Sequence, residues 1–214
     1  MLRTIILSLV VLGSSASGQV PPAGQIRDID GVTRDVFAPS GTANVLLFVA
    51  SDCPISNGYA PEIHRLCGEY RRKGISCALV YEDEAIDVAA VRTHRESFDY
   101  RDIPAVIDRA HAIAAAAHAT VTPQAVVVAA RGEVKYRGRI DNRYEQLGRP
   151  RRVVTIHDLR DALDAVSAGR TVVRPVTEPV GCFIPLARSV GGVAQAFRPA
   201  PDHVAQAFRP ACEP

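Results

Sequence analysis

The residues best suited to chemistry stand in the run 48–56, where Cys53 follows an apolar stretch, 45–49. A buried strand that turns into a helix at a cysteine places the sulfur at the helix N-terminus. There, unpaired backbone N–H groups and the helix dipole favour the thiolate, the reactive form of cysteine. Three positions further on stands Ser56, so the pattern is C-x-x-S and no disulfide can close within it. Cys53 is therefore the predicted catalytic residue.

The same run resembles the active-site stretch of thioredoxins. Phe48 and Ala50 match that stretch, and Cys53 falls where the attacking cysteine sits. Eight residues after Cys53, Pro61 matches the proline that kinks the active-site helix of the family. By this resemblance, Ser56 takes the place of the second cysteine and is expected to donate a hydrogen bond to the thiolate.

A second motif, Thr122-Pro123, directly precedes the apolar strand 126–128. In thioredoxin-like proteins a cis-proline at this place packs against the active-site sulfur. It leaves the preceding backbone free to pair with an extended substrate. The resemblance predicts that this bond is cis and that Thr122, Pro123 and Pro54 are substrate-binding residues.

The elements that must position these residues follow from apolar periodicity and turn residues. A hairpin at 25–37 is followed by strand 45–50, helix 57–73, strand 75–81, helix 86–98, strand 104–107, helix 109–119, a hairpin of strands 126–130 and 133–140, and helix 155–168 with Thr155 as N-cap. This order resembles the thioredoxin-like order with an inserted helix and strand. We expect an α/β thioredoxin-like fold, with a central mixed β-sheet flanked by helices and an N-terminal β-hairpin extension. Cys53 would lie at the carboxyl edge of its strand, where open α/β sheets carry their sites.

The stretches 52–57, 136–141 and 181–184 extend the resemblance to an exported redoxin, the peroxiredoxin-like branch of the superfamily, over residues 25–185. The redoxin resemblance implies redox chemistry at the cysteine. It implies protein or small-molecule thiols and disulfides, or a peroxide, as partners.

Several positions depart from these families. Peroxiredoxins carry a hydroxyl residue three positions before the cysteine and a proline seven before it, where this chain has Ala50 and Leu46. Thioredoxins keep a buried acid where Leu47 stands, and a tryptophan where Asp52 stands. An anion beside Cys53 would raise its pKa, so the thiolate is expected to be less activated than in the most oxidising members.

The remaining cysteines differ in context. Cys182 follows a glycine in an irregular stretch after the last predicted helix, so it is a candidate resolving thiol for Cys53; a surface thiol or a static disulfide is the alternative. Cys67 lies on a helical apolar stripe and Cys77 alternates in phase on a strand, so both are expected to be small buried hydrophobic residues. Cys212 lies close to the C-terminus.

No metal or cofactor is expected. The six histidines show no ligand spacing with cysteine, and His111 and His118 are expected on a solvated helix face. Copper-delivering relatives use a second cysteine where this chain has Asn57, and no histidine is spaced to form a cysteine–histidine hydrolase site.

The N-terminus predicts export. Residues 1–18 combine Arg3, the short apolar run 4–12 and small residues up to Gly18, as in a cleaved signal peptide. The apolar run is shorter than the ~20 residues that span a bilayer, so no membrane span is expected after cleavage. A periplasmic or extracellular location follows, in which disulfides form.

The C-terminus and the charge carry less information. The eight residues 193–200 recur as 204–211, and such an Ala-, Pro- and Arg-rich repeat cannot bury a core, so residues 186–214 are expected to be a disordered tail. The net charge is +2 with arginines scattered among acids, which argues against nucleic-acid binding. The oligomeric state is not indicated.

Three functions remain open from the sequence. The first is an exported thiol–disulfide oxidoreductase acting through Cys53. The second is a thiol peroxidase in which peroxide converts Cys53 to a sulfenic acid that Cys182 resolves. The third is a non-catalytic binding module that uses the groove at Thr122 and Pro123.

Overall fold

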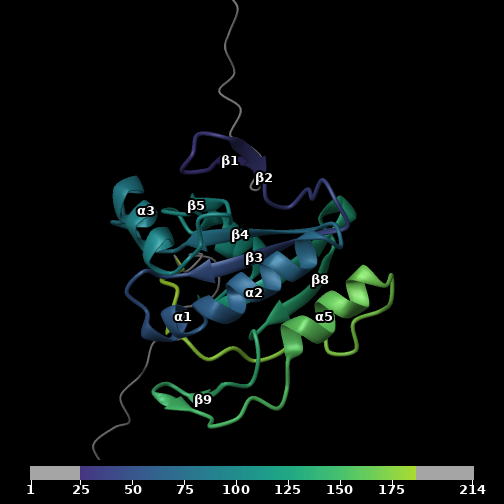
Figure 1. The fold of residues 1–214 in the computed structure, drawn as a ribbon. Coiled ribbons are helices and arrows are strands. Elements are labelled where there is room, and N and C mark those ends of the chain that lie inside the picture. Colours follow the sequence, from purple (N-terminus) through teal and green to yellow (C-terminus); the bar gives the residue numbers. More distant parts are fainter. Residues whose placement is uncertain (1–24, 187–214) are drawn as a thin grey trace, which may run out of the picture.

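A computed structural model describes residues 25–186, which form a five-stranded sheet with helices on both faces (Figure 1). The strand order is β5-β4-β3-β7-β8; β3, β4 and β5 are parallel, and β7 runs antiparallel to both β3 and β8. The expected thioredoxin-like fold is confirmed. In chain order the elements are β1 (Gln25–Arg27), β2 (Thr33–Asp35), β3 (Ala43–Val49), α1 (Pro54–Gly58), α2 (Ala60–Arg71), β4 (Ile75–Tyr81), α3 (Val88–Ser97), β5 (Ala105–Ile107), α4 (Ala112–Ala117), β6 (Val121–Thr122), β7 (Gln124–Ala129), a 3-10 turn (Ala130–Gly132), β8 (Val134–Gly138), β9 (Tyr144–Gln146), β10 (Arg149–Pro150), α5 (Asp158–Ser167) and β11 (Cys182–Phe183).

The predicted signal peptide and the predicted repeat-containing tail lie outside the described residues. Between residues 25 and 186, the chain contains no helix with the length and apolar character needed to cross a bilayer.

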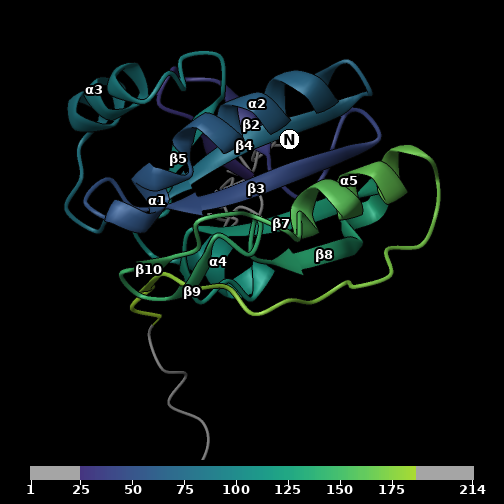
Figure 2. The same ribbon diagram turned by 60° about the horizontal axis from the view of Figure 1, so that its bottom comes forward.

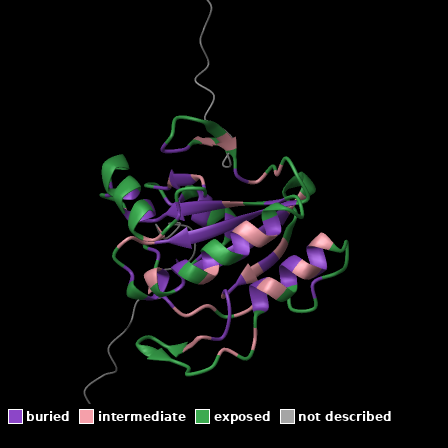
Figure 3. Cartoon of the chain, in the orientation of Figure 1, coloured by how far each residue is buried: buried purple, intermediate pink, exposed green. Residues whose placement is uncertain are grey.

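Strand β3 is buried along its whole length because helices cover both faces of the sheet (Figure 3). Val45, Leu47 and Val49 point into the core cluster that includes residues of α2 and α5, whereas Leu46 and Phe48 point into the cluster that includes α4. This alternation follows from the two-residue period of a strand, and a continuous apolar run is what a doubly covered strand requires. The end of β3 is therefore a rigid base for the residues that follow it.

The helix predicted at 57–73 begins earlier and is split in two. α1 starts at Pro54, and α2 starts at Ala60 after a break at Tyr59. Pro61 has no N–H to donate to the backbone oxygen four residues earlier, so the helical hydrogen-bond ladder is interrupted there. Gly74, with φ of +75°, ends the turn after α2.

The last helix also begins later than predicted. The sequence indicates Thr155 as its N-cap, but α5 begins at Asp158. Thr155 instead donates its N–H to the side-chain oxygen of Asn142 at 3.0 Å, and its hydroxyl accepts from the Asn142 amide at 2.9 Å. Asp158 is buried and pairs with Arg139 at 2.6 Å and Arg174 at 3.0 Å. These partners lie far away in the sequence, which local capping rules do not consider.

The expectation of a solvated histidine face was wrong for His111, whereas His118 is exposed as expected. α4 is shorter than the predicted helix, and His111 and His118 stand just outside its two ends with φ values of 51° and 53°. His111 is buried and hydrogen-bonds Glu82 through Nδ1 at 2.7 Å. Asp108 explains the late start, because its carboxylate accepts the N–H groups of residues 112 and 114 at 2.9 Å each.

The described chain begins with a hairpin and ends with a segment that returns along the sheet. The predicted N-terminal hairpin is present as β1 and β2, which turn at Gly31 with φ of +84°. After α5 the chain runs back beside β8, where Arg137 bonds to Pro175 and Thr177 through backbone groups, and reaches the edge near α1 (Figure 2). This return path carries Cys182 towards the end of β3.

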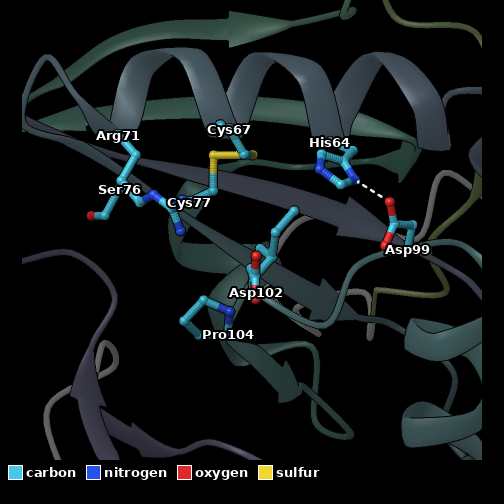
Figure 4. A pocket seen from close by; sticks show the side chains of 10 residues that line it. His64, Cys67, Arg71, Ser76, Cys77, Asp99, Asp102 and Pro104 are labelled. Atoms are coloured by element: carbon cyan, nitrogen blue, oxygen red, sulfur yellow. Dashed lines mark ion pairs between the residues drawn. A yellow bond between two sulfur atoms is a disulfide. The ribbon is translucent and has the colours of Figure 1, made fainter.

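Cys67 and Cys77 form a disulfide, which corrects their prediction as separate hydrophobic residues. Their Cα atoms lie 5.8 Å apart, because α2 packs directly on β4 and each cysteine is on the face of its element that meets the other. Figure 4 shows this bridge at the wall of a small cavity, beside the ion pair of His64 with Asp99 at 2.9 Å. Sequence periodicity predicts that both residues face the core, but it does not predict that they lie opposite each other.

We predict that this disulfide stabilises the fold. With Cys53, Cys182 and Cys212 replaced by serine, dithiothreitol should lower the free energy of unfolding by about 2–3 kcal/mol, the chain-entropy value for a loop of about ten residues. Urea denaturation measures the effect. The matched control also carries Cys67→Ala and Cys77→Ala and should not respond to the reductant; an equal response in both proteins would contradict the prediction.

Candidate active site

Cys53 stands at the N-cap of α1, four residues after the end of β3. Its side chain is 1% exposed, and its carbonyl accepts the N–H of Asn57 at 3.0 Å, the first bond of the helix. Backbone N–H groups of Ile55 and Ser56 approach the sulfur. The sulfur thus lies where sequence analysis expected it, at the positive end of a short helix at the carboxyl edge of the sheet.

The bond between Thr122 and Pro123 is cis, as predicted. Both residues are buried, and the Cys53 thiol donates to the carbonyl oxygen of Thr122 at 3.3 Å. The end of β6, directly before the cis-proline, therefore contacts the sulfur.

Cys182 lies directly against Cys53. β11 pairs antiparallel with β6, with Cys182 opposite Thr122, and this pairing brings the two cysteine sulfurs to 2.8 Å. Gly181 allows the approach, since a Cβ at that position would overlap the carbonyl group of Thr122. The backbone edge that the family resemblance leaves free for an extended substrate is therefore occupied by the chain's own residues 182–183.

The two thiols differ in acidity. Burial would raise the pKa of Cys53, but hydrogen bonds from the Cys182 thiol and from the backbone N–H of Ser56 outweigh it and lower that pKa below its ordinary value. Burial, the hydrogen bond to Cys53 and the nearby charges of Cys53 and Asp52 raise the pKa of Cys182 to about 12. The charge of Asp52, expected from the sequence to act against the Cys53 thiolate, acts on Cys182. Of the two thiols, Cys53 is therefore the one that ionises first as the pH rises.

Ser56 does not donate its hydroxyl to Cys53, contrary to the expectation. Its Oγ is buried and has no hydrogen-bond partner among the described residues. The contribution of Ser56 to the site comes from its backbone N–H, because at this first turn of α1 the backbone and not the side chain faces the sulfur. Pro54, another predicted site residue, is exposed at the first position of α1.

A chain of hydrogen bonds that sequence analysis did not identify holds this loop. Asn57 donates to the carbonyl oxygen of Ser51 at 2.9 Å, and its side-chain oxygen lies 2.9 Å from Nε2 of His94. Nδ1 of His94 lies 2.8 Å from the hydroxyl of Tyr81. Burial lowers the pKa of His94, so its neutral ring donates to Asn57 from Nε2 and accepts from Tyr81 at Nδ1.

The partners in this chain come from separate elements, so no local motif reveals them. A different signal was available for the acidic residues Glu82, Asp83 and Glu84, which follow β4 directly. Because the carboxyl ends of parallel strands share one edge of the sheet, these residues had to lie beside Cys53.

Comparisons with known proteins concern the fold. No protein-family model matches the chain, and no curated protein matches it. A hypothetical protein from Sinorhizobium meliloti superposes with a TM-score of 0.65 at 21% identity, covering 77% of this chain and 91% of that one. An uncharacterized conserved protein from Geobacillus kaustophilus gives 0.65 at 25% identity, covering 77% and 89%. A secreted disulfide oxidoreductase from Mycobacterium tuberculosis gives 0.45 at 19% identity, covering 51% and 78%.

We predict that the Cys182 thiol keeps the pKa of Cys53 low. Cys182→Ala removes the hydrogen-bond donor and should raise the pKa of Cys53, whereas Cys182→Ser retains a donor and should keep it nearer the wild-type value. Thiolate absorbance in the ultraviolet, followed against pH with Cys212 replaced by serine, measures both. An unchanged pKa in Cys182→Ala would show that the helix N-terminus alone sets the acidity.

Proposed function

We propose that the protein is an exported thiol–disulfide oxidoreductase in which Cys53 and Cys182 alternate between two thiols and one intramolecular disulfide. The observation that carries this proposal is the 2.8 Å separation of their sulfurs. A disulfide bond of ~2.05 Å requires only a small further approach. Because Ser56 denies Cys53 a partner within the motif, Cys182 supplies the second sulfur from the other end of the domain.

The exchange reaction moves two electrons. A thiolate of a client dithiol attacks the oxidised pair to give a mixed disulfide, and the second client thiolate then closes the client's own disulfide. The client loses two electrons, and Cys53 and Cys182 gain them as two thiols. The reverse sequence reduces a client disulfide. We assign substrate binding to Thr122, whose carbonyl accepts from the Cys53 thiol, to Pro123, which follows it in the cis form, and to the exposed Pro54 next to Cys53 in the chain.

Two further observations support this assignment. The unequal acidities of Cys53 and Cys182 suit exchange, since the more acidic thiol is the better leaving group. The disulfide between Cys67 and Cys77 is of the kind that persists in oxidising compartments, which agrees with the export signal proposed for residues 1–18.

The peroxidase alternative has less support. Position 50 is alanine and offers no hydroxyl to a peroxide, and loss of one such donor typically costs ~10²–10³-fold in rate. Cys53 is also covered by β11, so a peroxide has no open path to its sulfur in this arrangement. A non-catalytic binding module would use the two sulfurs only as a static disulfide, which would not oxidise a dithiol in the test below.

The proposal is tested with the mature protein. Oxidation with hydroxyethyl disulfide should give a Cys53–Cys182 disulfide, mapped by mass spectrometry and reversed by dithiothreitol. The oxidised protein should then oxidise a peptide dithiol. Cys53→Ser and Cys182→Ser should each lose the intramolecular bridge, while Cys212→Ser should keep it. Peroxide consumption at the rate of a dedicated peroxidase, or dithiol oxidation that survives in Cys53→Ser, would refute the proposal.

Gly181 should control closure of the bridge. In Gly181→Ala the new Cβ meets the Thr122 carbonyl, so β11 must leave β6 and the sulfurs lose their enforced proximity. We expect closure to slow by about tenfold or more, while iodoacetamide labels Cys53 faster at a pH where it is fully ionised. Gly68→Ala is the matched control, since a Cβ there meets nothing within 4 Å. If Gly181→Ala changes neither the rate of disulfide closure nor the rate at which iodoacetamide labels Cys53, β11 does not hold the two sulfurs together.

A further inference from the structure

An open groove of about 630 Å³ lies beside Cys182 at the carboxyl edge of the sheet. Its walls are the residues that follow β3, those that follow β4, and residues 182–185. Cys182 lines the groove and is partly exposed, whereas Cys53 is buried behind it. A molecule that enters the groove therefore meets the sulfur of Cys182 first.

Among residues 25–186, which the structure describes, the groove is lined by acids and by no lysine or arginine. Asp52 and Glu84 are exposed, and Asp83 is held in place by the N–H and the hydroxyl of Ser51, each at 3.1 Å. The charge of Asp52 also contributes to raising the pKa of Cys182, so the field of this carboxylate reaches the sulfur.

Glu82, a fourth acid in the groove wall, is buried, and its Oε1 has no hydrogen-bond partner among the described residues. Burial raises its pKa to about 8, and its other oxygen bonds to His111, so this pair adds little negative charge at neutral pH. Nε2 of His111 also lies 3.4 Å from Glu84, whose side chain remains exposed to solvent. The carboxylates of Asp52, Asp83 and Glu84 therefore give the groove its negative charge. The Oε1 atom of Glu82 adds a hydrogen-bond acceptor that no described residue satisfies.

An aromatic ring completes the lining. Phe183, next to Cys182, is 84% exposed and lines the same groove. The face of an aromatic ring attracts ammonium and guanidinium groups, as carboxylates do. Acids and ring together select for positive charge close to a reactive sulfur.

We propose, resting on the exchange function above, that the groove receives cationic thiols and that they attack Cys182. The incoming thiolate bonds to the sulfur of Cys182, the disulfide breaks, and Cys53 leaves with the electron pair as a thiolate. A second substrate thiolate attacks the substrate sulfur of the mixed disulfide, and Cys182 leaves and takes a proton. The substrate pair is oxidised to a disulfide by two electrons, and the protein is reduced by two.

Small thiols of different charge test the inference on the oxidised protein. Cysteamine is positive, mercaptoethanol neutral and mercaptopropionate negative. For each thiol, the rate at which it reduces the protein disulfide is expressed per thiolate. This rate is then divided by the rate at which the same thiol reduces hydroxyethyl disulfide. At low ionic strength the normalised rate of cysteamine should exceed that of mercaptopropionate by about tenfold or more, and added salt should reduce the ratio.

Variants connect the ratio to the groove. Asp52→Asn combined with Glu84→Gln should bring the ratio severalfold closer to one, because two of the three carboxylates lose their charge. Glu133→Gln is the matched control: its side chain is exposed in the turn before β8, at the opposite end of the sheet from Cys53, and it should leave the ratio unchanged. A ratio that falls equally in both proteins would overturn the inference.

Two further measurements identify which cysteine is attacked and which kind of thiol attacks it. Acid quenching early in the cysteamine reaction should trap the mixed disulfide on Cys182; trapping on Cys53 would overturn this entry route. End-blocked Lys-Cys-Lys reacting faster than cysteamine would identify basic peptide segments as the substrates, and an equal rate would identify small amine thiols. A wild-type ratio near one overturns the charge preference alone, whereas failure of every thiol, mercaptoethanol included, to reduce a Cys53–Cys182 bridge refutes the exchange function itself.

Discussion

The pairing of β11 with β6 is the constraint on which the site depends. It places Cys182 opposite Thr122 and brings its sulfur onto that of Cys53, although 129 positions separate the two cysteines in the chain. The same pairing covers Cys53 and fills the backbone edge beside the cis-proline. A C-x-x-S motif, which cannot close its own disulfide, is completed by a strand that arrives from the far end of the domain, and the missing side chain of Gly181 lets that strand lie close enough.

The burial of the pair then separates the roles of the two sulfurs. Cys53 is enclosed, receives hydrogen bonds and has a lowered pKa, whereas Cys182 is partly exposed and its pKa is raised to about 12. The loop that carries Cys53 is held by Asn57 and His94, so its position relative to β11 does not depend on the motif alone. One sulfur is suited to carry charge, and the other to meet a substrate in the acidic groove.

Sequence reasoning succeeded where the signal was local or came from a repeated pattern. The continuous apolar run of β3 and the hairpin at 25–37 could be predicted from pattern, and the cis bond before Pro123 could be predicted from the family resemblance. It failed where a distant partner decided the outcome. Thr155 resembles an N-cap but bonds to Asn142, because that amide offers two hydrogen bonds that a helix start would not.

By itself, the sequence determined the fold class through the order of its elements and the family resemblance of that order. It also determined the reactive candidate Cys53 and the presence of a second candidate, Cys182, because each of these rests on patterning over a few residues. Only the tertiary structure decided which cysteines meet. Cys67 and Cys77 are joined because helix α2 packs on β4, and Cys182 reaches Cys53 because the return segment pairs with β6. Such contacts depend on the register between elements, a property of the assembled sheet and its covering helices that no single segment encodes.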